Sequence, residues 1–325
     1  MLGQLEPAAA SFWKVDLRSG RDALIGRFAS PTAGAFKPEL WFDVAYAANT
    51  LVTVAGGAVV LFDLSTSGPG RELFSPPSGV VLQALPSITA DGTRVVVHYQ
   101  QEQMYGVLAI DVATGKATTL VRHGWWIGHT HFLPYDPTWI LFCHEGRCDT
   151  VPDRMWAYHP TRCPQGRVLF DQASSVQGTL LQVGHEVGCH HDACLLAVAY
   201  GVSDTGPRGV YQISLDGRAP KLVSSADRDL HCNISRNGRW IVVDTSGPHD
   251  APGRGWQDAQ GHSDVLLVDA ATGVRSLLAR SHILNHPWHP HPAFSPDGNS
   301  IIYGEAHPDN RGNVHLLTLA PAVVL

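Results

Sequence analysis

The stretch FSPDGNSIIY, residues 294–303, places a tight turn directly before a short apolar segment. Asp297 and Gly298 are turn residues that tolerate positive φ, and such a pair is typical of β-hairpins. The run 300–303 is short, apolar and rich in isoleucine, which favours a buried strand. The stretch therefore predicts a hairpin.

The same pattern recurs along the chain. Further turns of this type read ITADG at 88–92 and ISRNG at 234–238, each followed by an apolar segment. A second pattern is an apolar run that ends in Asp and continues into a turn containing Ser or Thr. It occurs at 13–20, 61–66, 109–115 and 267–273. Repetition with a period of about 40 residues indicates a repeat fold.

Six such units can be counted, and a half-unit precedes them. The units cover 40–74, 86–121, 131–170, 180–224, 230–280 and 290–318, and the half-unit covers 11–28. Four-stranded units of this length form propeller blades. We therefore expect an all-β protein, a β-propeller with seven blades of which the first is incomplete. Six blades is the alternative, and either number implies a single domain over residues 1–325.

Composition agrees with many short strands joined by turns, since 16% of the residues are charged and the chain has 32 Gly and 22 Pro. The net charge of −6 predicts neither a nucleic-acid partner nor binding to an anionic membrane. We find no apolar run of about 18 residues and no signal-like segment at 1–10, so we expect a cytoplasmic protein. The sequence makes no prediction of the oligomeric state.

The six cysteines are expected to be free, buried thiols, because a chain of this size without an export signal has little need of disulfides. Two pairs, Cys143 with Cys148 and Cys189 with Cys194, have four residues between them and lie beside histidines. This pattern leaves a zinc site as the alternative.

Histidine is abundant, with 18 residues. Several histidines lie just ahead of the repeated turns, where the innermost strand of a blade would line the central channel. Pro290 is expected to keep the backbone extended, so that His289 and His291 project to the same side. A third imidazole from a neighbouring blade would complete a site for a transition metal. A hydrogen-bonded histidine cluster is the alternative.

A second group of polar residues lies in FCHEG at 142–146 and DRMW at 153–156. The loop between them is expected at a mouth of the propeller. Both motifs also have a purely structural interpretation. Glu145 with Gly146 would form a turn, and Arg154 would tie two strands together.

At these residues the sequence resembles the oligogalacturonate lyases, seven-bladed propellers that cleave short pectin-derived uronides by β-elimination. The resemblance rests on five motifs in the same order, and it covers the chain from about residue 11 onward, most weakly before residue 120. The motifs are GH at 128–129, FCHEG at 142–146, DRMW at 153–156, GHE at 184–186, and HPHP at 289–292 leading into FSPD at 294–297.

The resemblance implies a role for individual residues. It implies a divalent metal, manganese in the family, held by His231, His289 and His291, with His286 where the family normally has glutamine. That replacement leaves zinc, nickel or iron open as the metal. His185 would be the catalytic base, and Arg154 would neutralise the substrate. Further candidates for substrate binding are His129, His144, Glu145 and Trp288.

The implied chemistry suits these residue types. A metal and an arginine on the C6 carboxylate of a uronide would stabilise the charge that develops when the C5 proton leaves. A neutral histidine can accept that proton near pH 7. We therefore expect a lyase acting on an acidic oligosaccharide. The alternatives are a lyase for another uronide, such as a glucuronate-containing oligosaccharide, and a non-catalytic propeller that binds sugars or proteins. A hydrolase using Glu145 or Glu186 is disfavoured, because no second carboxylate lies in a matching motif.

Overall fold

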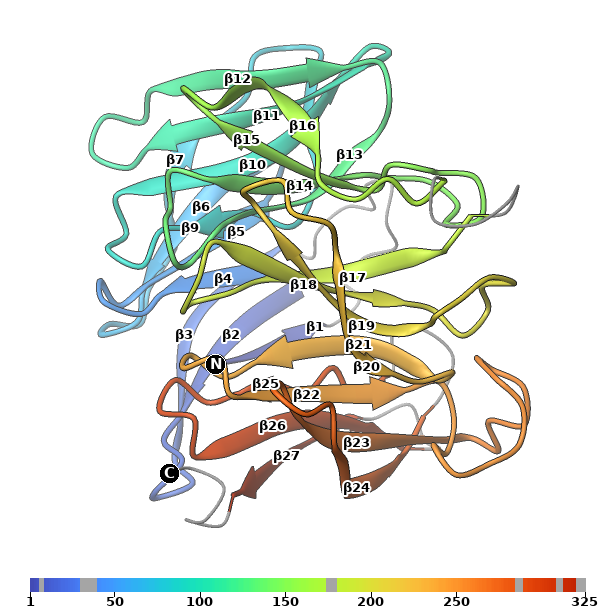
Figure 1. Ribbon diagram of the computed structural model, residues 1–325. Helices are drawn as coiled ribbons and strands as arrows, with labels where there is room; N and C mark the ends of the chain where they lie inside the picture. Colours follow the sequence, from blue (N-terminus) through green and yellow to red (C-terminus); the bar gives the residue numbers. More distant parts are fainter. Residues whose placement is uncertain (6–8, 30–39, 174–179, 284–288, 308–311, 320–325) are drawn as a thin grey trace. The chain divides into compact units, whose positions relative to one another are not determined.

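The computed structural model describes residues 1–5, 9–29, 40–173, 180–283, 289–307 and 312–319 (Figure 1). All regular structure in these residues is β-strand, and the strands form seven sheets of three to five strands. The chain groups into two compact units. Unit 1 comprises residues Met1–Glu145 and Trp156–Arg167, and unit 2 comprises Gly146–Met155 and Val168–Leu325. The single domain expected from the repeats stays a prediction.

Unit 1 contains four sheets. The first consists of β1 (Leu2–Leu5), β2 (Ala9–Val15) and β3 (Asp22–Ala29). The second consists of β4 (Phe42–Ala45), β5 (Thr50–Ala55), β6 (Ala58–Asp63) and β7 (Arg71–Phe74). The third consists of β8 (Val80–Leu82), β9 (Ser87–Ile88), β10 (Arg94–Gln101), β11 (Met104–Asp111) and β12 (Ala117–His123). The fourth consists of β13 (Ile127–Phe132), β14 (Ile140–His144), β15 (Met155–His159) and β16 (Cys163–Val168).

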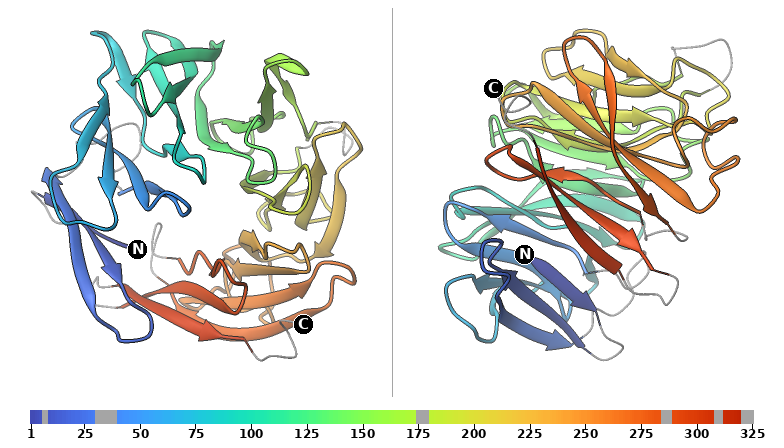
Figure 2. Two further views of the ribbon diagram at one scale, coloured as in Figure 1. Left: turned by 90° about the vertical axis from the view of Figure 1, so that its left-hand side faces the viewer. Right: turned by 90° about the horizontal axis from the view of Figure 1, so that it is seen from below.

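Unit 2 contains three sheets. The first consists of β17 (Val183–Gly188), β18 (Cys194–Ala199), β19 (Gly209–Ser214) and β20 (Lys221–Ser225). The second consists of β21 (Asp229–Ile234), β22 (Trp240–Thr245), β23 (His262–Asp269) and β24 (Arg275–His282). The third consists of β25 (Ala293–Phe294), β26 (Ser300–Ala306) and β27 (Gly312–Thr318). The innermost strands β17 and β21 contact each other. Figure 2 shows the two sheets that carry them, coloured yellow-green and gold, side by side.

The all-β, seven-bladed β-propeller predicted from the repeats is confirmed. Each of the six predicted units coincides with one sheet, and the half-unit before them coincides with the first sheet. In the described residues that sheet is incomplete, as expected, but it has three strands where the half-unit supplied only two, because β1 pairs with β2. The predicted turns are also present. Gly92, Gly238 and Gly298 have φ of +73°, +75° and +73°, and each donates its N–H to the residue three positions earlier.

Within each unit, the core lies between successive sheets. Every residue of β18 is buried, because one face of this strand contacts β21 and its sheet neighbours cover its edges. All six cysteines are free thiols, as expected; five are buried and Cys148 is half-buried. None of the described residues forms a helix that is long and apolar enough to cross a membrane.

Candidate functional site

His185 lies at a β-bulge in β17. The register of β17 with β18 shifts between Gly184 and Val187, and His185 has φ of +50°. This left-handed conformation is uncommon for residues other than glycine, and bulges re-aim side chains next to functional sites. Gly184 is required beside it, because a Cβ there would lie 2.0 Å from the Tyr200 hydroxyl oxygen. The sequence Gly-His therefore sets the direction of the His185 side chain.

The fourth sheet repeats this local geometry. β13 is irregular between Gly128 and His131, and His129 has φ of +49°. A Cβ on Gly128 would lie 2.4 Å from Cγ of Glu145. The two Gly-His motifs therefore build the same bulge on the innermost strands of two consecutive sheets.

Four histidine rings gather in unit 2, and His231 lies at their centre. The centroid of the His231 ring is 3.4 Å from that of His291 and 3.8 Å from that of His185. The centroid of the His289 ring is 5.6 Å from that of His231. The structure thus brings together the predicted base and three of the predicted metal ligands from β17, β21 and the segment before β25.

His231 is held by a buried carboxylate. Its Nδ1–H donates to Asp244, with both carboxylate oxygens 2.8 Å away. Asp244 also accepts the backbone N–H of His231 at 2.7 Å and that of His291 at 3.0 Å. Burial alone would raise the pKa of Asp244, but the charge and hydrogen bonds of His231 lower it below its usual value. The carboxylate therefore stays ionised beside two of the predicted ligands.

The other ring nitrogen of His231, Nε2, is buried and has no hydrogen-bond partner. A buried polar atom without a partner is costly, unless a ligand satisfies it. A histidine that donates one N–H to a carboxylate and leaves its second nitrogen available has the arrangement typical of a metal ligand. Together with the neighbouring imidazoles, His231 fits a divalent transition metal.

The backbone at 289–291 differs from the expectation. His291 has φ of +44°, so the extended conformation predicted from Pro290 is wrong at this residue. The physical reason is the hydrogen bond from the His291 N–H to Asp244, which turns the chain toward β22. Both rings nevertheless lie near His231. His289 is 8% exposed, whereas His291 is exposed. His286 and Trp288 lie outside the described residues.

Arg154 belongs to unit 2 and is buried. Its backbone N–H donates to Oε1 of Gln172 at 2.8 Å, and Nε2 of Gln172 donates to the carbonyl of Leu181 at 2.7 Å. The fully buried Gln172 side chain therefore fixes the segment that carries Arg154. Sequence reasoning missed Gln172 and Asp244, because neither lies in a motif and both act on residues distant in the chain.

The remaining candidates for substrate binding belong to unit 1. Nε2 of His129 lies 3.5 Å from Oε1 of the buried Glu145. One ligand atom each from His129, Cys143 and Glu145 lies within 4.8 Å of the others. The His144 ring packs at 4.3 Å between centroids on Trp125, which also contacts Trp156. The substrate-binding roles of these residues stay predictions.

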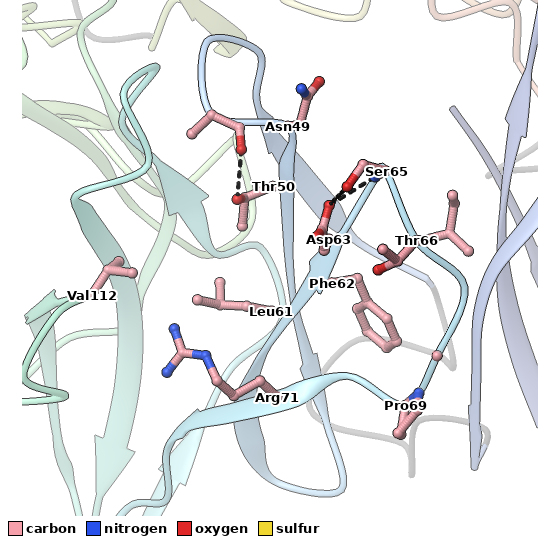
Figure 3. Close-up of a pocket in the computed structure, with 13 residues that line it drawn as sticks. Asn49, Thr50, Leu61, Phe62, Asp63, Ser65, Thr66, Pro69, Arg71 and Val112 are labelled. Atoms are coloured by element: carbon pink, nitrogen blue, oxygen red, sulfur yellow. Dashed lines mark hydrogen bonds between the residues drawn. The ribbon is translucent and has the colours of Figure 1, made fainter.

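A cavity of about 520 Å³ in unit 1 is separate from these residues (Figure 3). It lies between β3, β5, β6 and neighbouring loops, with Phe62 and Arg71 in its wall. The carboxylate of Asp63 accepts hydrogen bonds from the backbone and hydroxyl of Ser65, which makes it a turn residue. None of the predicted site residues that the structure describes lines this cavity.

The fold and the histidine cluster define a β-propeller with a centre suited to a transition metal. The chain matches the oligogalacturonate lyase family over residues 88–323, and it belongs to that family. The match begins at residue 88, whereas the motifs suggested a resemblance from about residue 11.

Three known proteins illustrate the similarity. The chain is 25% identical over 210 residues to an oligogalacturonide lyase of Pectobacterium atrosepticum and 26% identical over 210 residues to an oligogalacturonate lyase of Dickeya dadantii. Each alignment covers 61% of this chain and 51% of the relative, so the chain spans about half the length of these relatives. A solved structure of an oligogalacturonate lyase in complex with manganese aligns with a TM-score of 0.77 at 20% identity, covering 97% of this chain and 84% of the other.

Proposed function

We propose that this protein is a metal-dependent lyase that cleaves short oligogalacturonates by β-elimination. Membership of the oligogalacturonate lyase family and the names of the relatives support this activity. The observation that carries the proposal is the cluster of imidazoles around His231, whose Nε2 is buried without a hydrogen-bond partner.

The metal would be held by His231, His289 and His291, with His286 as a fourth ligand by resemblance to the family. The manganese in the related structure favours manganese, and the imidazole donors also suit zinc, nickel or iron. When bound, a divalent cation stabilises negative charge on the carboxylate of the substrate.

The side chains supply the remaining steps. The guanidinium of Arg154 binds the C6 carboxylate, a partner that matches its planar donors. The imidazole of His185 accepts the C5 proton. The electron pair of the C5–H bond forms a double bond between C4 and C5. The C4–O bond breaks, its electrons stay with the oxygen, and that oxygen takes up a proton from water. The products are an unsaturated uronide and a shortened oligosaccharide.

The bulge at His185 supports its role as the base. The left-handed backbone turns this one side chain out of the regular alternation of β17 and places its ring beside His231. A residue held in such a conformation is typical of functional sites, because the backbone strain must be offset by the surrounding structure.

The proposal is tested by the ultraviolet absorbance of an unsaturated uronate. Di- and trigalacturonate are offered to metal-free protein and to protein given manganese, zinc or nickel. Growth of the absorbance that depends on metal supports the lyase. A flat trace from metal-loaded protein would redirect the assay to glucuronate-containing oligosaccharides. Failure to bind any metal would favour a non-catalytic binding propeller.

A further inference from the structure

The hairpin that joins β17 to β18 is shown in Figure 1. It carries a second group of side chains of the types that bind metals, namely Cys189, His191 and Cys194. Cys189 directly follows β17, and Cys194 begins β18. The N–H of Cys189 donates to the carbonyl of Cys194 at 3.0 Å, and the preceding ladder pairs Gly188 with Leu195. The two cysteines are therefore cross-strand neighbours, whose side chains lie on the same face of the sheet.

His191, in the loop between them, completes a three-ligand group. One ring nitrogen of His191 and the sulfur atoms of Cys189 and Cys194 all lie within 4.8 Å of one another. In a tetrahedral zinc site the metal–sulfur distance is about 2.3 Å and the metal–nitrogen distance is about 2.0 Å, so ligand atoms are roughly 3.3–3.8 Å apart. The group therefore needs only a small contraction to bind such a cation.

Gln212 stabilises negative charge on one of the two thiols. Nε2–H of Gln212 donates to Sγ of Cys194 at 3.2 Å, which favours negative charge on that sulfur. Thiolate is the form of cysteine that binds metals, so a bound cation would displace the protons of the thiols.

The environment of the His191 ring is a second, independent indication of a ligand at this hairpin. Its Nδ1 is buried and has no hydrogen-bond partner. The ring packs on Gly238, where a Cβ would lie 2.4 Å from Cδ2 of the imidazole. Packing therefore holds the ring beside the two thiols, and one ring nitrogen lacks a hydrogen-bond partner. A disulfide between the two cysteines would leave this nitrogen unsatisfied.

We propose that Cys189, His191 and Cys194 bind a zinc-class divalent cation in a structural site, distinct from the histidine centre around His231. The sequence CHHDAC at 189–194 supplies the three ligands from one hairpin. Asp192, in the same loop, or a water molecule supplies the fourth. Thiolates select zinc-like cations over manganese, so the two sites differ in metal preference. The bound cation would pin the end of β17, the strand that carries His185.

The test is cobalt titration of reduced, metal-free protein. Cobalt bound to thiolate gives an intense charge-transfer band in the near ultraviolet, which a site made of imidazoles does not give. We expect the band to reach the intensity of one thiolate-bound cobalt per chain, while cobalt taken up by the histidine centre adds nothing to it, and to disappear when zinc is added. Cys194→Ser should abolish it. His191→Gln, which leaves both buried thiols in place, should raise the dissociation constant at least about tenfold.

Two control variants separate this site from the other thiols. Cys163→Ser removes a buried thiol outside the group, and Cys143→Ser removes the thiol beside His129 and Glu145. Both should keep the band. A band that survives Cys194→Ser, or that is absent from the reduced wild-type protein, would overturn the proposal. So would a native mass that shows a disulfide between Cys189 and Cys194. The lyase assay tests the histidine centre, which contains none of these residues, so failure of this proposal and failure of the lyase proposal are distinguishable.

Discussion

Asp244 and His231 form a buried pair in which Nδ1 of the imidazole lies 2.8 Å from both carboxylate oxygens. The same carboxylate accepts the backbone N–H of His291, which is 47 residues further along the chain. One side chain of β22 therefore orients two predicted metal ligands that come from different sheets. It also fixes the tautomer of His231, so that Nε2 is the nitrogen that can bind a cation.

Asp244→Asn should weaken metal binding by about 10- to 100-fold, because the amide neither fixes the tautomer nor raises the basicity of His231. Isothermal titration with manganese or zinc measures the change. Asp264→Asn is the matched control, since Asp264 is equally buried and accepts Nδ1–H of His249 at 2.6 Å. Equal losses of affinity in the two variants would assign the effect to folding and not to the orientation of His231.

His185→Asn should retain the metal and lower kcat by about 10²- to 10⁴-fold, as expected for removal of a general base. Asparagine is chosen because it tolerates the left-handed backbone at φ of +50°, whereas alanine would add strain. Metal content and the rate of unsaturated product formation are measured on the same preparation.

His129→Asn, at φ of +49° in the equivalent bulge of β13, measures what the same substitution costs in stability. If His185→Asn instead loses the metal while remaining folded, His185 is a ligand and another group is the base.

Arg154→Lys should lower kcat/KM by about 10- to 100-fold, because a charged hydrogen bond to the substrate carboxylate contributes roughly 1.5–3 kcal/mol and lysine lacks the paired donors of arginine. Steady-state kinetics on trigalacturonate give the value. Arg228→Lys is the control, since Arg228 is also buried in unit 2 but donates to the carbonyl of Gly255. A comparable loss in the control would indicate a structural effect.

Local rules explain why much of the fold and part of the site could be predicted from the sequence. Gly92, Gly238 and Gly298 had the positive φ that their turns require, and the spacing of these turns led to the correct number of sheets. The convergence of His185 and His231 followed from their equivalent places ahead of the repeated turns.

Features that depend on tertiary contacts could not be predicted from the sequence. Asp244 follows the apolar run 240–243 and resembles Asp63, Asp111 and Asp269, which also follow apolar runs. Its role depends on which imidazole faces it. Gln172 contacts Arg154 across 18 residues. The left-handed backbone of His291 contradicted the preference that Pro290 implied, because one hydrogen bond to a buried carboxylate outweighed the local tendency.

His98→Leu should stabilise the protein and reduce its sensitivity to acid. His98 in β10 is fully buried, and neither of its ring nitrogens has a hydrogen-bond partner. Burial, with a smaller contribution from the charge of His129, lowers the pKa of His98 to about 3. Removing a buried polar group without a partner should raise the free energy of unfolding by about 1–3 kcal/mol at pH 7.

The pH dependence follows from the direction of that shift. Between pH 6.5 and about 3 the unfolded chain binds a proton at His98 and the folded protein does not, so His98 destabilises the fold progressively as the pH falls through this range. The loss is about 1.4 kcal/mol for each pH unit below 6.5. Urea unfolding at pH 7 and pH 5 should therefore show a larger advantage of the leucine variant at pH 5. His315→Leu is the control, because His315 is partly exposed and pairs with Glu305 at 2.9 Å. An advantage of His98→Leu that is the same at both pH values would show that His98 binds a proton equally well in the folded and unfolded protein, and would place a compensating charge beside β10.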